Sequence, residues 1–159
     1  MAALERLYSI VFENVTVSAV QDLFAVKASA TNGLALRRLS LSASGVTAAA
    51  EIRIRLKRLP ATVTIGSGGT APTVQKVQSR LNMGSLSTNA RANDTTQATT
   101  SGTAVTLANW NWNVLQDFLE VPATEEERWE ADVSEALVFD IIATPASTVL
   151  SGVMVFEET

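Results

Sequence analysis

The feature that most restricts the fold is a strict alternation in residues 51–57. Every second residue there is apolar, and the residues between them are the cations Arg53, Arg55 and Lys57. Successive side chains of a β-strand point to opposite faces, so this spacing predicts a half-buried strand with a basic outer face. Three cations in line repel one another and favour acidic neighbours. Such a face is either a solvated strand surface or a binding stripe for an acidic partner.

Similar short apolar or alternating runs recur along the chain, separated by Asn-Gly, Ser-Gly and Pro-containing segments. They predict further strands at residues 8–12, 15–19, 22–28, 34–41, 74–77, 104–107, 115–121, 137–142 and 149–156. Eight or more short strands with little helix are typical of sandwiches and jelly rolls. We therefore expect an all-β fold, an antiparallel β-sandwich that resembles a jelly roll.

Two local irregularities accompany these strands. The alternation of leucines in residues 34–41 shifts phase at Arg37 and Arg38, which predicts a β-bulge. A helix is suggested only at Thr124, where Glu127 three residues later forms a capping box. The same segment can equally be a tight loop that leads into a strand.

Three segments lack strand character. Residues 66–72 are rich in glycine and read as a flexible connector, and residues 84–102 are almost wholly small and polar. We expect residues 84–102 to be an extended loop or arm that builds no core, and residues 1–7 to be a second arm. With 159 residues, 47% of them hydrophobic, the whole chain is otherwise expected to be one domain.

The chain contains neither cysteine nor histidine. This excludes thiol nucleophiles, zinc–thiolate sites, disulfides, the Ser-His-Asp triad and imidazole as a general base. We expect no enzymatic activity, no catalytic residue, no metal and no cofactor. Charged residues interrupt the first twenty positions, so neither a signal peptide nor a membrane span is expected. The acidic sequence pI of about 4.8 argues against nucleic-acid binding.

The charges are divided unevenly along the chain. Eleven of the twelve basic residues precede residue 92, whereas residues 92–159 carry only Arg128 against twelve carboxylates. Two interpretations follow. Basic and acidic surfaces can stay apart and join identical subunits, or the two halves can interleave in one antiparallel fold and pair their charges internally.

Two groups of residues are candidates for binding. Trp110 and Trp112 share one face if their segment is extended, and they could anchor a protein interface, stack on a sugar ring or close one end of the core. The acidic group Glu125, Glu126 and Glu127 invites a glycosidase or calcium site. Consecutive residues point in different directions, however, so we expect these carboxylates to be solvated or to meet a basic partner.

Several segments together resemble small β-rich virion proteins of tailed bacteriophages. The likeness rests on residues 20–28, 92–98, 122–128, 135–139 and 150–158, and so it spans most of the chain. One departure is Asp132-Val-Ser134, where similar sequences often have Pro-Gly. The resemblance implies a capsid decoration, or cement, protein with a β-sandwich or jelly-roll fold, commonly trimeric, that sits where capsid subunits meet.

We therefore expect a structural virion protein that binds the major capsid protein and its own copies. It would be made in the host cytoplasm and located on the capsid surface. The expected contacts are between the basic face of Arg53, Arg55 and Lys57 and the carboxylates Glu125 to Glu127. The alternatives are a carbohydrate-binding module of a phage fibre that uses Trp110 and Trp112, or a head–tail or tail component.

Overall fold

The computed structural model describes residues 6–78 and 89–159, and in that part every regular element is a strand. The strands are β1 (Arg6–Val17), β2 (Asp22–Lys27), β3 (Leu34–Ser44), β4 (Glu51–Leu59), β5 (Val63–Thr64), β6 (Gln75–Lys76), β7 (Asn89–Asp94), β8 (Thr99–Thr100), β9 (Val105–Asn113), β10 (Phe118–Glu120), β11 (Glu130–Ala131), β12 (Ala136–Ile141) and β13 (Thr148–Glu158). Within the described ranges no helix is long and apolar enough to cross a membrane.

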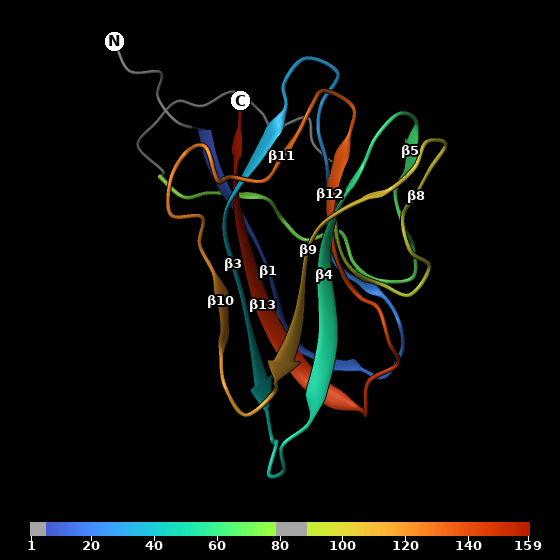
Figure 1. The fold of residues 1–159 in the computed structure, drawn as a ribbon, viewed down its shortest axis with the longest axis vertical. Coiled ribbons are helices and arrows are strands. Elements are labelled where there is room, and N and C mark those ends of the chain that lie inside the picture. The colour runs from blue at the N-terminus through green and yellow to red at the C-terminus, as the bar shows by residue number, and fades with distance from the viewer. Residues whose placement is uncertain (1–5, 79–88) are drawn as a thin grey trace.

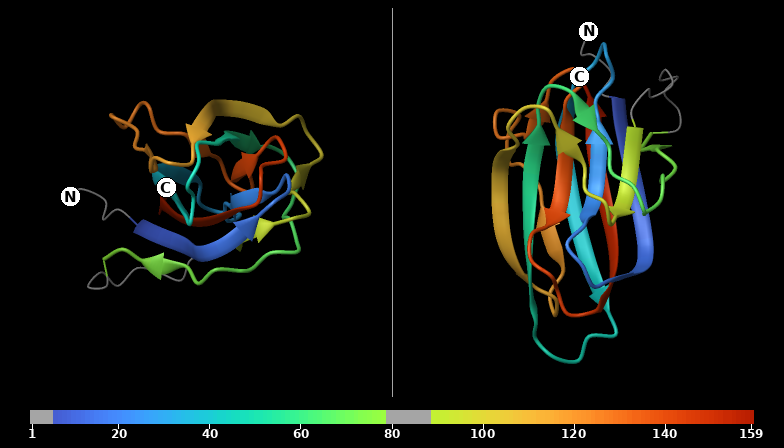
Figure 2. Two further views of the ribbon diagram at one scale, coloured as in Figure 1. Left: turned by 90° about the horizontal axis from the view of Figure 1, so that it is seen from below. Right: turned by 90° about the vertical axis from the view of Figure 1, so that its right-hand side faces the viewer.

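Eleven of these strands form two antiparallel sheets that pack face to face, and β5 and β8 form a separate two-stranded sheet (Figure 1). Sheet A has the order β10-β3-β13-β1-β6, with β11 also paired to β3, and sheet B has the order β7-β2-β12-β4-β9. The chain crosses repeatedly from one sheet to the other, so strands distant in sequence become neighbours, as the two views of Figure 2 show. Four strands of sheet A, in the order β1-β13-β3-β10, face β2-β12-β4-β9 of sheet B, which is jelly-roll topology. The expected fold class is confirmed.

Alternation of side chains accounts for the core. Along β13 every second residue is buried and the residues between are partly exposed, as a strand with one face on a core requires. Phe139 on β12 is fully buried, and its ring stacks on that of Phe118 with centroids 5.8 Å apart. Each such side chain contributes about 1.5–3 kcal/mol when it is removed from water. Burial between the sheets is therefore what holds the sandwich together.

Two bulges adjust the long strands of sheet A. Arg38 pairs with Val155 and Leu36 pairs with Phe156, so Arg37 is an extra residue in β3. This confirms the predicted bulge. A second register shift between Phe12 and Val15 joins the two predicted N-terminal strands into the single strand β1. Asn14 in this bulge has a φ of 52°, a left-handed conformation that asparagine tolerates better than most residues.

The long connection between β4 and β9, residues 60–104, departs from the sequence prediction. Its described part adds β6 to an edge of sheet A and β7 to an edge of sheet B, and it pairs β5 with β8. The prediction that residues 84–102 build no core is wrong for residues 89–102, since Ala90, Ala92 and Ala98 are buried. Alanine is small but apolar, so a segment rich in alanine can be buried even though its composition is that of a loop. Residues 84–88 of the predicted arm lie outside the described residues.

The glycine-rich segment is packed and does not behave as a flexible connector. A side chain at Gly69 would collide with the carbonyl oxygen of Ala92 and the backbone of Asn93. The Gly69 amide donates a hydrogen bond of 2.9 Å to Asp94 Oδ1, and Thr70 pairs with Ala92 through two backbone hydrogen bonds of 2.9 Å. Glycine is required here because the backbone lies directly against β7.

Two smaller expectations are also settled. Of the predicted N-terminal arm, residues 1–5 lie outside the described residues, and Arg6 and Leu7 already belong to β1, paired with Glu158 and Glu157. The segment that follows Thr124 forms a turn and not a helix, with the Arg128 amide bonded to the Glu125 carbonyl at 3.3 Å. The tight-loop alternative is therefore the confirmed one.

Candidate protein interface

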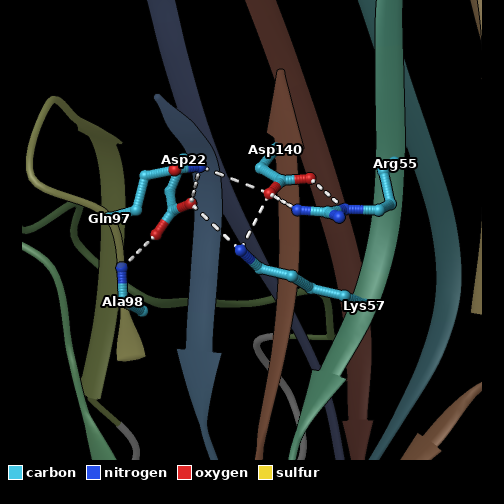
Figure 3. Close-up of polar contacts among 6 residues, drawn as sticks. All are labelled: Asp22, Arg55, Lys57, Gln97, Ala98 and Asp140. Atoms are coloured by element: carbon cyan, nitrogen blue, oxygen red, sulfur yellow. Dashed lines mark hydrogen bonds and ion pairs between the residues drawn. The ribbon is translucent and has the colours of Figure 1, made fainter. Parts of the chain in front are cut away.

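The predicted basic face on β4 is only partly present, because two of its three cations belong to a buried ion cluster. Figure 3 shows Asp22 from β2, Asp140 from β12, and Arg55 and Lys57 from β4 pointing toward one another. Arg55 makes two hydrogen bonds to the Asp140 carboxylate, of 3.0 and 2.6 Å, and Lys57 Nζ lies 2.8 Å from Asp140 Oδ2. Lys57 is only 5% exposed, so the expectation that it belongs to a solvent-accessible basic face is wrong: it lies on the outer side of sheet B but is covered there. Arg53 alone remains exposed.

The cluster attaches the connection between β4 and β9 to the outer face of sheet B. The Ala98 amide donates a 2.6 Å hydrogen bond to Asp22 Oδ2, and the Gln97 side chain bonds to both Asp22 and Asp140. Burial raises the pKa of Asp22 to about 6, although the Ala98 amide and the Lys57 charge oppose this shift. The hydrogen bonds to Asp140 raise the pKa of Arg55. Their geometry assigns these charges a structural role.

Other charges pair across the two halves of the chain in the same way. Arg6 lies 3.5 Å from Glu158, and Arg37 lies 2.8 Å from Glu157, which Arg128 also approaches at 3.3 Å. Antiparallel pairing of β1 and β3 with β13 brings these residues together. For these pairs the interleaving interpretation is confirmed, because the charges that are separate in sequence meet within one molecule.

The two tryptophans close one end of the core. Trp112 is 4% exposed, and its indole N–H donates a 2.6 Å hydrogen bond to the Gln116 carbonyl. Trp110 is partly exposed and meets the rings of Phe118 and Trp129 edge to face, at centroid distances of 5.3 and 6.0 Å. A sugar platform needs two exposed indole faces, so that alternative is wrong for Trp112. The core alternative is confirmed.

The acidic group lies on the turn between β10 and β11, with Glu125, Glu126 and Glu127 all exposed. Glu125 lies 2.9 Å from Arg128, and Glu126 and Glu127 point into solvent. Across the described ranges, no three potential metal-ligating side chains gather in a way that could hold a metal ion. The interface role predicted for Arg53 and these glutamates remains a prediction.

The surface that sequence reasoning missed is the outer face of sheet A. Its side chains form a layer of valine, leucine and serine, and we call it the valine face; it comprises Ser9, Val11, Ser40, Ser42, Val77, Leu119, Val121, Ser151, Val153 and Val155. Cross-strand pairing aligns four of these residues in one row that crosses the sheet: Val11 pairs with Val153, Val153 with Ser40, and Ser40 with Leu119. Leu119, at the end of this row, is 62% exposed.

The valine face is partly concave and is bordered by charge on two sides. A depression of about 670 Å³ extends from this row toward Glu13 and Asp117, which line it. On the other side of the row, Arg38 on β3 and Lys76 on β6 border Val121 and Val155. Arg38 is exposed, and no ion pair is seen for it among the described residues. The face therefore has an uncharged centre, a cationic end and an anionic end.

The sequence carries a weak signal for this face. On β13 the residues that point away from the core are Val149, Ser151, Val153 and Val155. They are uncharged, as are the core residues between them, so the sequence of this strand does not alternate between apolar and charged residues. An uninterrupted uncharged run of this kind indicates a strand that is covered on both sides. A strand of that composition at the surface makes this face the candidate interface.

Neither a protein-family model nor a curated protein matches this sequence. Among solved structures, a weak likeness is found to one described as "Structure of infectious bursal disease virus Gx strain", with 15% sequence identity and a TM-score of 0.17. The aligned region covers 98% of this chain and 40% of that chain. This chain therefore spans less than half of the viral chain, and a likeness at this TM-score carries no conclusion about fold or function.

Proposed function

We propose that this chain is a structural virion protein that decorates and stabilises a bacteriophage capsid by binding capsid subunits and its own copies. The observation that carries the proposal is the valine face, an uncharged and partly concave surface on a rigid sheet. Large apolar patches on monomeric proteins mark interaction sites, and six of the ten residues of the valine face are valine or leucine, with serines between them. The sequence resemblance to phage head proteins supports the same proposal.

The chemistry of the chain supports a binding role over turnover. The buried carboxylates Asp22 and Asp140 are neutralised by Arg55 and Lys57, so they are not held in a cleft with free access to a substrate. The valine face offers apolar contacts and hydroxyl groups, with no group suited to proton transfer at neutral pH. An assembly protein needs a rigid surface and complementary charge, and this chain has both.

We assign contacts with the major capsid protein to exposed charged side chains for which residues 6–78 and 89–159 supply no ion pair. Arg53 lies on the exposed side of β4, and Glu126 and Glu127 lie on the turn between β10 and β11. These side chains are outside the valine face, so a molecule could bind the capsid and a second copy at the same time. Contacts of exposed charges are screened by salt, so binding to the capsid would weaken as ionic strength rises.

The proposal is tested by co-sedimentation of the purified protein with capsids that lack it. We expect binding at low salt that is reduced by Arg53→Glu and by the pair Glu126→Lys and Glu127→Lys. Thr16→Lys, an exposed change on β1, is the matched control and should bind normally. Failure of the protein to co-sediment at any ionic strength would contradict the proposal.

A further inference from the structure

We infer that the valine face binds the valine face of a second copy of this chain, in a two-fold symmetric dimer whose axis crosses the strands of sheet A. This inference deepens the proposed function by naming the occupant of its central surface. The surface itself identifies the partner. It has an uncharged centre between a cationic end and an anionic end, so a second copy that is turned end to end places each charged end against the opposite charge.

The end charges select the direction of the symmetry axis. Two faces in contact can be related by an axis that runs either along the strands or across them. An axis along the strands would place the end that carries Arg38 against the same end of the copy. An axis across the strands places the cationic end of each face against the end that carries Glu13 and Asp117. Only the second arrangement pairs opposite charges.

The register of the sheet locates the axis. Arg38 and Ser42 lie on the same strand, four residues apart, which is about 13 Å. Asp117 lies beside Ser42, since Phe118 pairs with Leu41. The midpoint between Arg38 and Ser42 is Ser40, in the row that joins Val11, Val153, Ser40 and Leu119. An axis along this row places each of its residues opposite its own copy, with Arg38 of one molecule near Asp117 of the other.

The size of the face suits a weak, reversible contact. The face and its charged ends extend about 13–20 Å along the strands, and the five strands β10-β3-β13-β1-β6 span about 24 Å, so the face measures roughly 300–500 Å². A dimer would then bury about 600–1,000 Å² in total, which is the range of weak and transient interfaces. We expect a reversible dimer in solution that is reinforced when many copies are held on a capsid.

This geometry differs from the trimer that the sequence resemblance implies. A face that binds the same face of another copy makes an isologous contact, and such a contact closes after two subunits. A trimer would need two different surfaces that bind head to tail. Oligomeric state therefore distinguishes the two arrangements, and sedimentation velocity at several protein concentrations should show monomer and dimer only.

Single cysteines provide the direct test, because the native chain has none. Ser40→Cys lies on the proposed axis, so its two copies in the dimer would face each other. Ser42→Cys lies on the same strand and face, about 7 Å from the axis, so the two copies of this cysteine would be about 13 Å further apart along the strands. A short bismaleimide should link Ser40→Cys into dimers in several-fold higher yield than Ser42→Cys. Labelling with a monofunctional maleimide controls for thiol reactivity. Equal yields would overturn the inference, as would products no larger than a monomer.

A charge swap tests the same contact without a crosslinker. Arg38→Glu and Asp117→Arg should each raise the dimer dissociation constant by about 2- to 30-fold, because each breaks two symmetric pairs of exposed charges. The double variant should restore dimerisation. Failure of the double variant to recover would overturn the inference. If dimerisation fails while the protein still co-sediments with capsids, the proposed function stands and only this inference falls.

Discussion

Replacing Lys57 by methionine would remove the cation that lies between two buried carboxylates. Lys57 Nζ is 2.8 Å from Asp140 and 3.9 Å from Asp22, and both acids are almost fully shielded from water. Methionine keeps most of the side-chain volume, so the effect reports the lost charge and not a cavity. Loss of one partner from a buried ion pair costs about 3–5 kcal/mol, because the remaining charge is left uncompensated. We expect a loss in this range, and Arg55 would still neutralise part of the Asp140 charge.

Urea unfolding followed by tryptophan fluorescence measures this loss. With a slope of about 2 kcal/mol/M, the midpoint should fall by about 2 M relative to the native chain. Arg53→Met, an exposed change on the same strand, is the matched control and should alter stability by less than about 0.5 kcal/mol. The Lys57→Met deficit should also shrink from pH 7 to pH 5, because burial raises the pKa of Asp22 to about 6 and its carboxyl group takes up a proton in this range. A Lys57→Met variant as stable as the control would refute the structural role of the cluster.

Three further predictions concern stability. The pKa of Asp22 is raised from 3.8 to about 6, so between these pH values the native state binds more protons than the unfolded state. The free energy of unfolding should therefore rise as the pH falls from about 6 to about 4. Asp22→Asn should abolish this part of the pH dependence in urea titrations at several pH values. Phe139→Ala should lose about 3–5 kcal/mol in the same assay, whereas a loss below about 1 kcal/mol would show that its site is not packed as described. Gly69→Ala should lower the stability by about 1–3 kcal/mol, because its methyl group would overlap the Ala92 carbonyl, and an unchanged melting temperature would contradict that packing.

Local patterns predicted the architecture well. Alternation in residues 51–57 and the phase shift at Arg37 both correspond to features of the structure, a half-buried strand and a bulge. These features depend on near neighbours along one strand, which the sequence displays directly. The prediction failed at β7, because a strand built from two alanines, two asparagines, an arginine and an aspartate has the composition of a loop. The burial of β7 depends on its neighbours in the fold, β2 and the glycine-rich segment, which are distant in sequence.

The candidate site was harder to predict for the same reason. Lys57 and Asp140 are distant in sequence and become partners only because β12 pairs with β4. The alternation that marked Arg55 and Lys57 as outward-facing is correct, but residues 97 and 98 then cover that outer face. The valine face requires knowledge of which strands share a sheet, and no local pattern contains that information.

The measurement that tests the central claim most directly is the copy number of this chain in purified virions, by quantitative mass spectrometry against the major capsid protein. A protein that covers the shell through repeated contacts should be present in numbers comparable to the major capsid protein. A handful of copies per particle would indicate a neck, vertex or tail component instead. Absence from the particle would contradict a structural role in the virion.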